Sequence, residues 1–172
     1  MKSYLPDKLK NLIGYYNRIN LICRPTPLYP MTNLSRKLAG PKIMVKRDDL
    51  TGLAFGGNKS RKLEFIVAEA LSKGADTLIT WGSLQSNWCL QLAAAGRKVG
   101  LRPILVLFKT YDLPFFYDGN VLLEHLLGVE IQVRETSAKG KSPNQEEAFM
   151  VLSEVAEAER KKGFMPYLVS VG

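Results

Sequence analysis

Apolar residues along the chain recur at two spacings, one typical of amphipathic helices and one of buried strands. The first segment repeats apolar residues at helical spacing, which predicts a helix over residues 5–16. The prolines of RPTPLYP then hold the chain extended and exclude this stretch from the centre of a sheet. We expect a short helical turn over 34–38 and a strand over 42–49, with Ile43 and Val45 on one face.

From about residue 59 onward, strands and helices alternate regularly. The mostly apolar segments TLITW and PILVLF and the alternating segment EIQVRE predict strands, and YLVSVG begins another. Between them we expect helices over about 59–73, 85–98, 119–127 and 145–163. This alternation predicts an α/β fold, an open parallel sheet with helices on both faces. Such sheets bind ligands beyond the carboxyl ends of their strands.

Composition and charge narrow the class of protein. The chain has 172 residues, enough for one ordinary domain, and its 46% hydrophobic content is typical of globular proteins. No apolar run approaches the ~20 residues of a membrane span, and the start carries no secretory signal. The net charge of +8 is scattered singly or in pairs along the chain. We therefore expect a cytoplasmic protein without a membrane or nucleic-acid partner.

The cysteines and the single histidine exclude several kinds of site. Cys23 and Cys89 are far apart and match no paired metal or redox spacing, so both are expected to be reduced structural thiols. A histidine-based metal site or a serine–histidine triad would depend on His125 alone. We expect no metal site and a structural role for His125.

The loop DDLTGLAFGGNKSRKLE is the first candidate for chemistry. It places three glycines directly before a predicted helix, whose free N–H groups can receive an anion. Lys59 lies in the first turn of that helix, where the helix dipole disfavours a cation. Because the positive end of the helix opposes the charged form of an amine, this position suits a nucleophilic lysine.

A nucleotide-binding interpretation of the same loop fails on spacing. Gly52 and Gly57 have the separation of a P-loop, but Asn58 intervenes before Lys59. One extra residue rotates the lysine by about 100° around the helix, away from the phosphates. The sequence also lacks the G-x-G-x-x-G pattern of dinucleotide-binding proteins. Both nucleotide classes are therefore disfavoured.

The second candidate is the junction TLITWGSLQSNWCLQ. The apolar strand ends at Trp81, and the polar cluster Gln85, Ser86 and Asn87 leads into a helix. Serine and asparagine are ordinary helix caps, so each residue alone has a structural explanation. Together they stand where open α/β sheets bind ligands.

Four strings in order, PTPLYP, VKRDDLTG, GGNKSRKLE and GSLQSN, resemble the amino-terminal half of a known family. This is the 1-aminocyclopropane-1-carboxylate deaminase / D-cysteine desulfhydrase family of pyridoxal-phosphate enzymes, with the fold of the tryptophan-synthase β-subunit (fold type II). The resemblance covers nearly the whole chain. It implies pyridoxal 5′-phosphate as cofactor and a lyase or deaminase acting on a small amino acid.

The resemblance also implies roles for individual residues. Lys59 would form the Schiff base with the cofactor aldehyde, and Asn87 would hydrogen-bond the cofactor's 3′-oxygen. Ser86, with Gln85 and Asn87, would hold the substrate carboxylate, and Ser86 would also act as a nucleophile or proton carrier. Two further residues have supporting roles: Asn58 would orient the loop, and Lys62 would approach the cofactor phosphate or lie on the surface.

Two positions depart from the family pattern. Trp88 and Leu90 stand where the family usually has a histidine and an arginine. An indole N–H donates a hydrogen bond, but unlike a histidine ring it cannot take up and release a proton. These departures bear on the substrate and on the chemistry.

The resemblance further implies an organisation of the chain. Residues 1–53 would be the amino-terminal part of a large domain, 54–162 a small α/β domain, and 163–172 the return strand to a truncated large domain. The glycine-rich phosphate-binding loop of the family would follow. We therefore expect a truncated or split enzyme that needs a complementing carboxy-terminal segment or forms a homo-oligomer. The alternative is a non-catalytic remnant that acts as a binding or interaction module.

Overall fold

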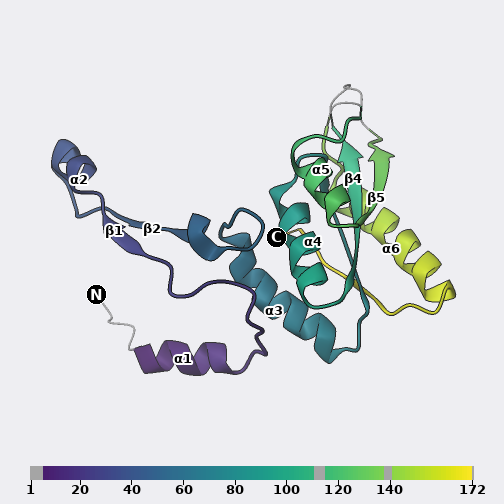
Figure 1. Ribbon diagram of the computed structural model, residues 1–172, viewed down its shortest axis with the longest axis horizontal. Helices are drawn as coiled ribbons and strands as arrows, with labels where there is room; N and C mark the ends of the chain where they lie inside the picture. The colour runs from purple at the N-terminus through teal and green to yellow at the C-terminus, as the bar shows by residue number, and fades with distance from the viewer. Residues whose placement is uncertain (1–5, 111–114, 138–140, 172) are drawn as a thin grey trace.

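The computed structural model describes residues 6–110, 115–137 and 141–171 (Figure 1). The helices and strands alternate from α3 onward, as the sequence predicts. In chain order they are α1 (Pro6–Gly14), β1 (Leu28–Pro30), α2 (Thr32–Leu38), β2 (Met44–Lys46), the 3₁₀ turn η1 (Asp48–Thr51), α3 (Lys59–Ser72), β3 (Thr77–Ser83), α4 (Asn87–Lys98), β4 (Arg102–Lys109), α5 (Gly119–Leu126), β5 (Glu130–Glu135), α6 (Gln145–Lys161) and β6 (Pro166–Leu168).

Four parallel strands form the sheet in the order β5-β4-β3-β6. Strand β3 is central, and its Ile79 lies beside Ile104 of β4 and Leu168 of β6. Helices α4 and α6 flank the strands on opposite sides in Figure 1. The predicted α/β class, an open parallel sheet with helices on both faces, is confirmed. We refer to residues 59–169 as the sheet unit.

Two hydrophobic clusters hold the sheet unit together, one on each face of the sheet. On one face, α6 covers alternate strand residues that include Ile79, Val106 and Phe108, all within 1% of complete burial. On the other face, α3 and α4 pack with α5 over Leu78, Leu105 and the neighbouring strand residues. The two inner strands, β3 and β4, are therefore buried on both faces, which accounts for the unbroken hydrophobic runs in their sequences.

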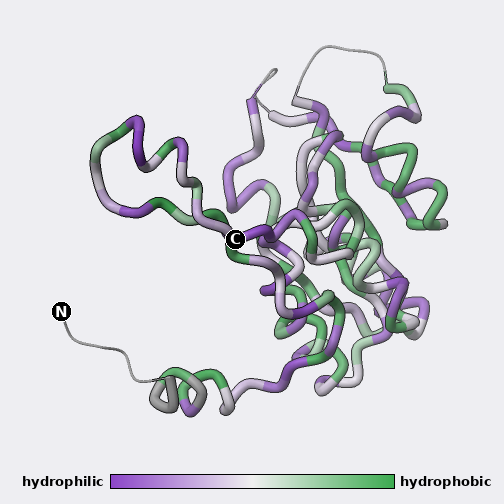
Figure 2. The backbone as a smooth tube through the Cα atoms, turned by 60° about the vertical axis from the view of Figure 1, so that its left-hand side comes forward, coloured by the Kyte–Doolittle hydropathy of each residue, from purple (hydrophilic) through white to green (hydrophobic). Residues whose placement is uncertain are grey.

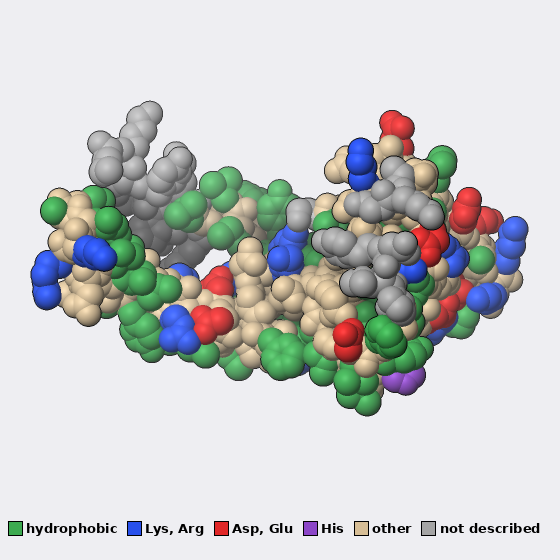
Figure 3. All heavy atoms as spheres, turned by 90° about the horizontal axis from the view of Figure 1, so that it is seen from above, with side chains coloured by type: hydrophobic (Ala, Val, Ile, Leu, Met, Phe, Trp, Pro, Cys, Tyr) green, Lys and Arg blue, Asp and Glu red, His purple; other side chains and the backbone are tan. Residues whose placement is uncertain are grey.

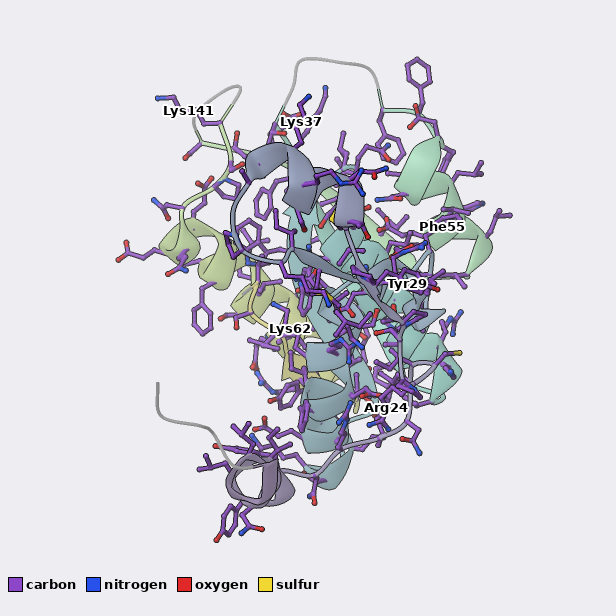
Figure 4. The ribbon with its side chains drawn as sticks, turned by 90° about the vertical axis from the view of Figure 1, so that its left-hand side faces the viewer. Arg24, Tyr29, Lys37, Phe55, Lys62 and Lys141 are labelled. Atoms are coloured by element: carbon purple, nitrogen blue, oxygen red, sulfur yellow. The ribbon has the colours of Figure 1, made fainter. Side chains whose placement is uncertain are left out.

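The segment before the sheet unit, residues 6–58, extends away from it, and we call it the arm. Strands β1 and β2 pair antiparallel around α2, which has no buried residue. Figures 1 and 2 show this hairpin and α1 projecting from the sheet unit, and Figure 3 shows hydrophobic side chains gathered along the arm. Figure 4, viewed from the arm side, labels Arg24 and Tyr29 in this segment and Lys37 in α2.

A buried carboxylate attaches the arm to the sheet unit. Glu64 of α3 accepts hydrogen bonds from the backbone N–H of Leu21 at 3.0 Å and of Ile22 at 3.3 Å, and it pairs with Arg18. Burial alone would raise the pKa of Glu64, but the Leu21 N–H, the Arg18 guanidinium and the Ile22 N–H outweigh it and lower that pKa. The carboxylate therefore stays charged and holds residues 18–22 against α3.

Several predicted boundaries differ from the structure. The strand expected over 42–49 is limited to Met44–Lys46, because Asp48 and Asp49 lie in the 3₁₀ turn η1. The helix expected to reach residue 16 ends at Gly14. The helix expected from Gln85 begins at Asn87, because Ser86 is its N-cap. The strand expected over 167–172 ends at Leu168, and beyond it the Thr80 hydroxyl donates to the Val169 carbonyl at 2.7 Å. The expected ends of the first helix at residue 5 and of the last strand at Gly172 lie outside the described residues. Across the described ranges, no helix combines the length and apolar character that crossing a bilayer requires.

Candidate functional site

The two loops singled out in the sequence lie side by side. Gln91 of α4 donates from Nε2 to the Gly56 carbonyl at 2.9 Å, and its Oε1 accepts from the Ser60 hydroxyl at 2.8 Å. Ser60 follows Lys59 directly, and Gln91 lies one helical turn after Asn87. A buried glutamine thus joins the loop that carries Lys59 to the helix that begins at Asn87.

The loop before Lys59 has a backbone that only glycine accommodates at two points. Gly56 and Gly57 have φ angles of +76° and +124°. A Cβ at Gly56 would lie 1.9 Å from the Asp49 carbonyl oxygen, so a side chain is excluded there. Ala54 and Phe55 also have positive φ angles, +44° and +65°. Such a run of sparsely populated conformations is typical of functional loops.

Lys59 is the first residue of α3 and is half-buried. Asn58 occupies the N-cap position, but its side chain makes no capping hydrogen bond. The N–H groups of the first turn therefore keep their positive end beside the lysine. This confirms the predicted local structure, a lysine in the first turn of a helix that follows a glycine-rich loop.

Lys62 and Trp88 contact each other across the two loops. The Lys62 ammonium lies 4.5 Å from the centre of the Trp88 ring (Lys62 is labelled in Figure 4). Trp88 is 3% exposed, and its Nε1 donates to the Thr80 hydroxyl at 2.9 Å. The indole that replaces the family histidine therefore directs its one donor into the sheet, and its ring faces Lys62.

Leu90, which stands in place of the family arginine, faces another direction. It is 3% exposed and lines an apolar groove of about 340 Å³ between α4 and α5. Phe55, 80% exposed and labelled in Figure 4, lies on the same groove. The apolar side chain of Leu90 agrees with these surroundings.

The amino-terminal end of α4 holds Ser86 at its N-cap. The Ser86 hydroxyl accepts from the Cys89 backbone N–H at 3.3 Å. A Cβ at Gly82 would lie 2.7 Å from Ser86 and Cys89 atoms, so the strand and helix meet there in close contact. Burial raises the pKa of the Cys89 thiol to about 12, which keeps it protonated. His125 is exposed, and its ring centre lies 4.6 Å from that of Tyr117.

Gln85 and Asn87 take part in a network of amide side chains with the start of α5. Gln85 donates from Nε2 to the Asp118 carboxylate at 2.9 Å, and its Oε1 accepts from the Asn120 backbone N–H at 2.8 Å. Asn120 donates from Nδ2 to the Asn87 Oδ1 at 2.9 Å and to the Gln85 carbonyl at 3.1 Å. Sequence reasoning missed Asp118 and Asn120. The string Asp-Gly-Asn at the start of a helix was the available signal, and it is also typical of an ordinary cap.

An ion pair on the far side of the lysine loop joins the two ends of that loop, and sequence reasoning missed it. Arg61 donates two hydrogen bonds of 2.7 Å to the carboxylate of Asp48, and a third of 2.8 Å to the Thr26 hydroxyl. The hydrogen bond from Arg61 holds the pKa of Asp48 below its ordinary value. This bidentate pair fixes residues at both ends of the loop relative to each other.

Comparison with known proteins identifies the family. The profile of the pyridoxal-phosphate dependent enzymes matches residues 19–170. The chain belongs to this family. Its enzymes depend on pyridoxal phosphate, which confirms the cofactor that the resemblance implies.

Individual relatives are of the expected kind. A Yersinia enterocolitica D-cysteine desulfhydrase is 41% identical over 167 residues, 95% of this chain and 48% of the relative. A Pyrococcus abyssi protein that carries the provisional name 1-aminocyclopropane-1-carboxylate deaminase is 41% identical over 165 residues, 96% of this chain and 47% of the relative. The chain thus spans about half the length of these relatives.

Solved structures agree with the sequence relatives. The crystal structure of an ACC deaminase homologue superposes with a TM-score of 0.83 at 37% identity, over 96% of this chain and 48% of that one. An O-ureido-L-serine synthase, at 20% identity and a TM-score of 0.57 over 82% of this chain and 40% of that one, shares the fold. The fold type II assignment is confirmed.

The donors at the site match what pyridoxal phosphate requires of a protein. Lys59 supplies a primary amine in the first turn of α3, and Ser86 supplies a hydroxyl at the N-cap of α4. Asn87 supplies an amide whose oxygen is already engaged by Asn120, which leaves its NH₂ group as a donor. An amine for an aldehyde and an NH₂ donor for a ring oxygen are the complementary groups, so the residues fit the cofactor.

Proposed function

We propose that the protein is a pyridoxal-phosphate dependent lyase or deaminase that acts on a small amino acid of the 1-aminocyclopropane-1-carboxylate or D-cysteine type. The observation that carries the proposal is the junction of two loops: Gln91 joins the Gly-Gly-Asn-Lys loop to the Gln-Ser-Asn helix start. The relatives named for these two substrates support the substrate class.

Lys59 is the proposed catalytic lysine. Its primary amine, in the first turn of α3 directly after the glycine-rich loop, would hold the cofactor through its aldehyde. The bound cofactor supplies an electron sink for negative charge that develops on the amino-acid carbon. Asn58, at the N-cap, would orient the loop through its backbone, and Lys62, whose ammonium lies over the Trp88 ring, stands one turn further along and would approach the cofactor phosphate.

Ser86 and the first turn of α4 form the proposed substrate side of the site. The Ser86 oxygen accepts from the Cys89 N–H, and in the proposed function the hydroxyl donates to a substrate carboxylate or carries a proton. Backbone N–H groups at a helix start add further donors for that carboxylate. Both ends of the Gln85 amide are engaged with α5, so we assign Gln85 to holding this turn in place, with Asn87 directed to the cofactor.

The proposed activity also needs contacts to the cofactor phosphate. Because the chain spans about half of its relatives, we propose that the remaining contacts to the cofactor phosphate come from a complementing carboxy-terminal segment, or from a second copy in a homo-oligomer. The exposed hydrophobic residues of the arm support this proposal, since such a surface is typical of one that packs against another segment or chain.

The test is to locate the lysine that binds the cofactor. The protein is incubated with pyridoxal phosphate, reduced with borohydride and digested, and the modified peptide is identified by mass spectrometry. We expect the modification on Lys59, and a cofactor absorption band that the Lys59→Ala variant loses. The matched control is Lys73→Ala, an exposed lysine at the other end of α3, which should keep the band. A band that survives in Lys59→Ala, with the label on another lysine, would overturn the assignment.

A further inference from the structure

In the amide network between α4 and α5, backbone groups determine which end of each side-chain amide is the NH₂ group and which is the oxygen. The Gln85 carbonyl accepts from one end of the Asn120 side chain at 3.1 Å. A backbone carbonyl can only accept, so that end of Asn120 must be its NH₂ group. The orientation of Asn120 is therefore not free.

A second backbone group fixes Gln85 in the same way. The Asn120 backbone N–H donates to the Gln85 Oε1 at 2.8 Å, and a backbone N–H can only donate. The Gln85 NH₂ group then points to two acceptors of Asp118, its carboxylate at 2.9 Å and its carbonyl at 3.3 Å. Every donor in this half of the network meets an acceptor.

The orientation of the Asn120 amide determines the orientation of the Asn87 amide. The Asn120 NH₂ group has two hydrogens, one for the Gln85 carbonyl and one for the Asn87 Oδ1 at 2.9 Å. Asn87 must therefore present its oxygen to Asn120, since the reverse orientation would bring two NH₂ groups together. Within the part of the chain that the structure describes, no acceptor lies against the Asn87 NH₂ group.

We infer that Asn120 is a positioning residue that turns the NH₂ group of Asn87 toward the cofactor's 3′-oxygen. The inference rests on the proposed function. A donor at this oxygen stabilises its negative charge and so lowers the proton affinity of the bound chromophore. The reverse orientation of Asn87 would place an oxygen there and repel that charge. Asn120 thus sets the sign of an interaction that it does not itself make.

The principal test is a pH titration of the visible absorption band of the cofactor-loaded protein. Asn120→Asp can only accept, so Asn87 should turn its NH₂ group to the new carboxylate. We expect the apparent pKa of the band to rise by about one, a tenfold change in proton affinity. Asn120→Ala, which frees Asn87 without adding a charge, should raise it by less.

Two controls separate orientation from structure and from charge. Asp118→Ala weakens the same bridge on its Gln85 side but leaves Asn120 donating to Asn87, so the pKa of the band should stay unchanged. In an Asn87→Ala background, Asn120→Asp reports its added charge alone, and Asn120→Ala should have no effect. A pKa rise that persists in full in that background would overturn the inference.

A second readout needs no cofactor. In the protein without pyridoxal phosphate, NMR should detect a coupling through the hydrogen bond from the Asn120 side-chain nitrogen to the Asn87 side-chain carbonyl carbon. A coupling in the opposite direction, from the Asn87 nitrogen, would overturn the inference even if the cofactor binds at Lys59. Absence of any cofactor band in the unmodified protein would overturn the proposed function, and the cofactor-directed role of Asn120 with it.

Discussion

The arm and the sheet unit are stabilised in different ways. In the sheet unit, side chains such as Leu78, Leu92 and Leu105 are completely buried between the strands and helices. In the arm, comparable side chains are exposed: Leu38 by 60% and Tyr16 by 71%. The sheet unit therefore buries its own core, whereas most of the arm's apolar surface stays in contact with solvent.

The difference shows what holds the arm in place. Besides the apolar contacts of Leu21 and Leu53 with the sheet unit, two of its attachments are charged and hydrogen-bonded: Glu64 receives residues 18–22, and Arg61 binds Asp48 and Thr26. Both attachments come from α3, the helix that also carries Lys59. The arm is thus placed by polar contacts against α3 together with the buried side chains of Leu21 and Leu53, while its exposed apolar side chains, such as Leu38, remain available to another surface.

Among the variants that test this difference, the largest loss of stability should come from removing Glu64, the buried carboxylate that attaches the arm. Glu64→Ala should lower the free energy of unfolding at pH 7 by about 3 kcal/mol, because the Leu21 and Ile22 N–H groups and Arg18 lose their acceptor. Urea denaturation measures the change. The matched control is Glu69→Ala on the exposed face of the same helix, which pairs only with Lys73 among the described ion pairs and should change stability by less than about 0.5 kcal/mol.

The pH dependence gives the Glu64 prediction its sign. Since the pKa of Glu64 in the folded protein lies below the ordinary value of 4.5, its contribution is present above that pH and is lost as the pH falls through the folded pKa. The penalty of Glu64→Ala should therefore shrink in acid. An equal penalty at pH 7 and at strongly acidic pH would contradict a charged attachment.

The sheet unit should show the opposite pH dependence at Glu124. This carboxyl is completely buried on α5, and among the described residues neither of its oxygens has a hydrogen-bond partner. Burial raises its pKa from 4.5 to about 8. The folded state thus holds a proton that the unfolded state releases, so stability should fall as the pH rises from about 4.5 to 8, by at most ~1.4 kcal/mol per pH unit.

Glu124→Gln tests this directly. The neutral amide should raise the midpoint of thermal unfolding at pH 8.5 relative to the unmodified protein, and change it little at about pH 3.5, where the Glu124 carboxyl is neutral in both the folded and the unfolded state. Glu154→Gln, at an exposed position of α6, is the control and should show neither effect. A variant that is equally affected at both pH values would show that Glu124 is not protonated in the folded state.

The smallest effect should come from the arm's own apolar surface. Leu38→Ala in α2 should change the free energy of unfolding by less than about 0.5 kcal/mol, because Leu38 is already 60% exposed. Leu92→Ala in the buried face of α4 should cost about 3 kcal/mol in the same assay. A large cost for Leu38→Ala would mean that the arm packs against a surface in solution, and would remove the distinction between the two regions.

The sequence predicted what depends on local pattern. The alternation of apolar segments is sufficient for the parallel sheet, the strand Glu130–Glu135 was predicted with its observed bounds, and Lys59 was correctly placed in the first turn of its helix. These features follow from residues close together in the chain, through propensity, capping and glycine conformation.

The sequence could not predict pairings between distant residues. Asn120 and Asn87 are 33 positions apart, and Glu64 and Leu21 are 43 apart. Trp88 was correctly described as a donor, yet its acceptor, Thr80, lies on the strand before it and was not foreseen. A polar residue in a helix gives no local sign of which distant group it will meet, so the buried Glu124 was missed as well.

The order of the strands also governs how the molecule is made. Strand β3 lies between β4 and β6, and the contact of its Thr80 with Val169 joins residues 89 positions apart. During synthesis, the edge of β3 that pairs with β6 stays unpaired until residues 166–169 have left the ribosome. At ~5–20 residues per second, this takes several seconds. A central strand whose neighbour comes so much later in the chain slows folding and exposes the growing chain to aggregation.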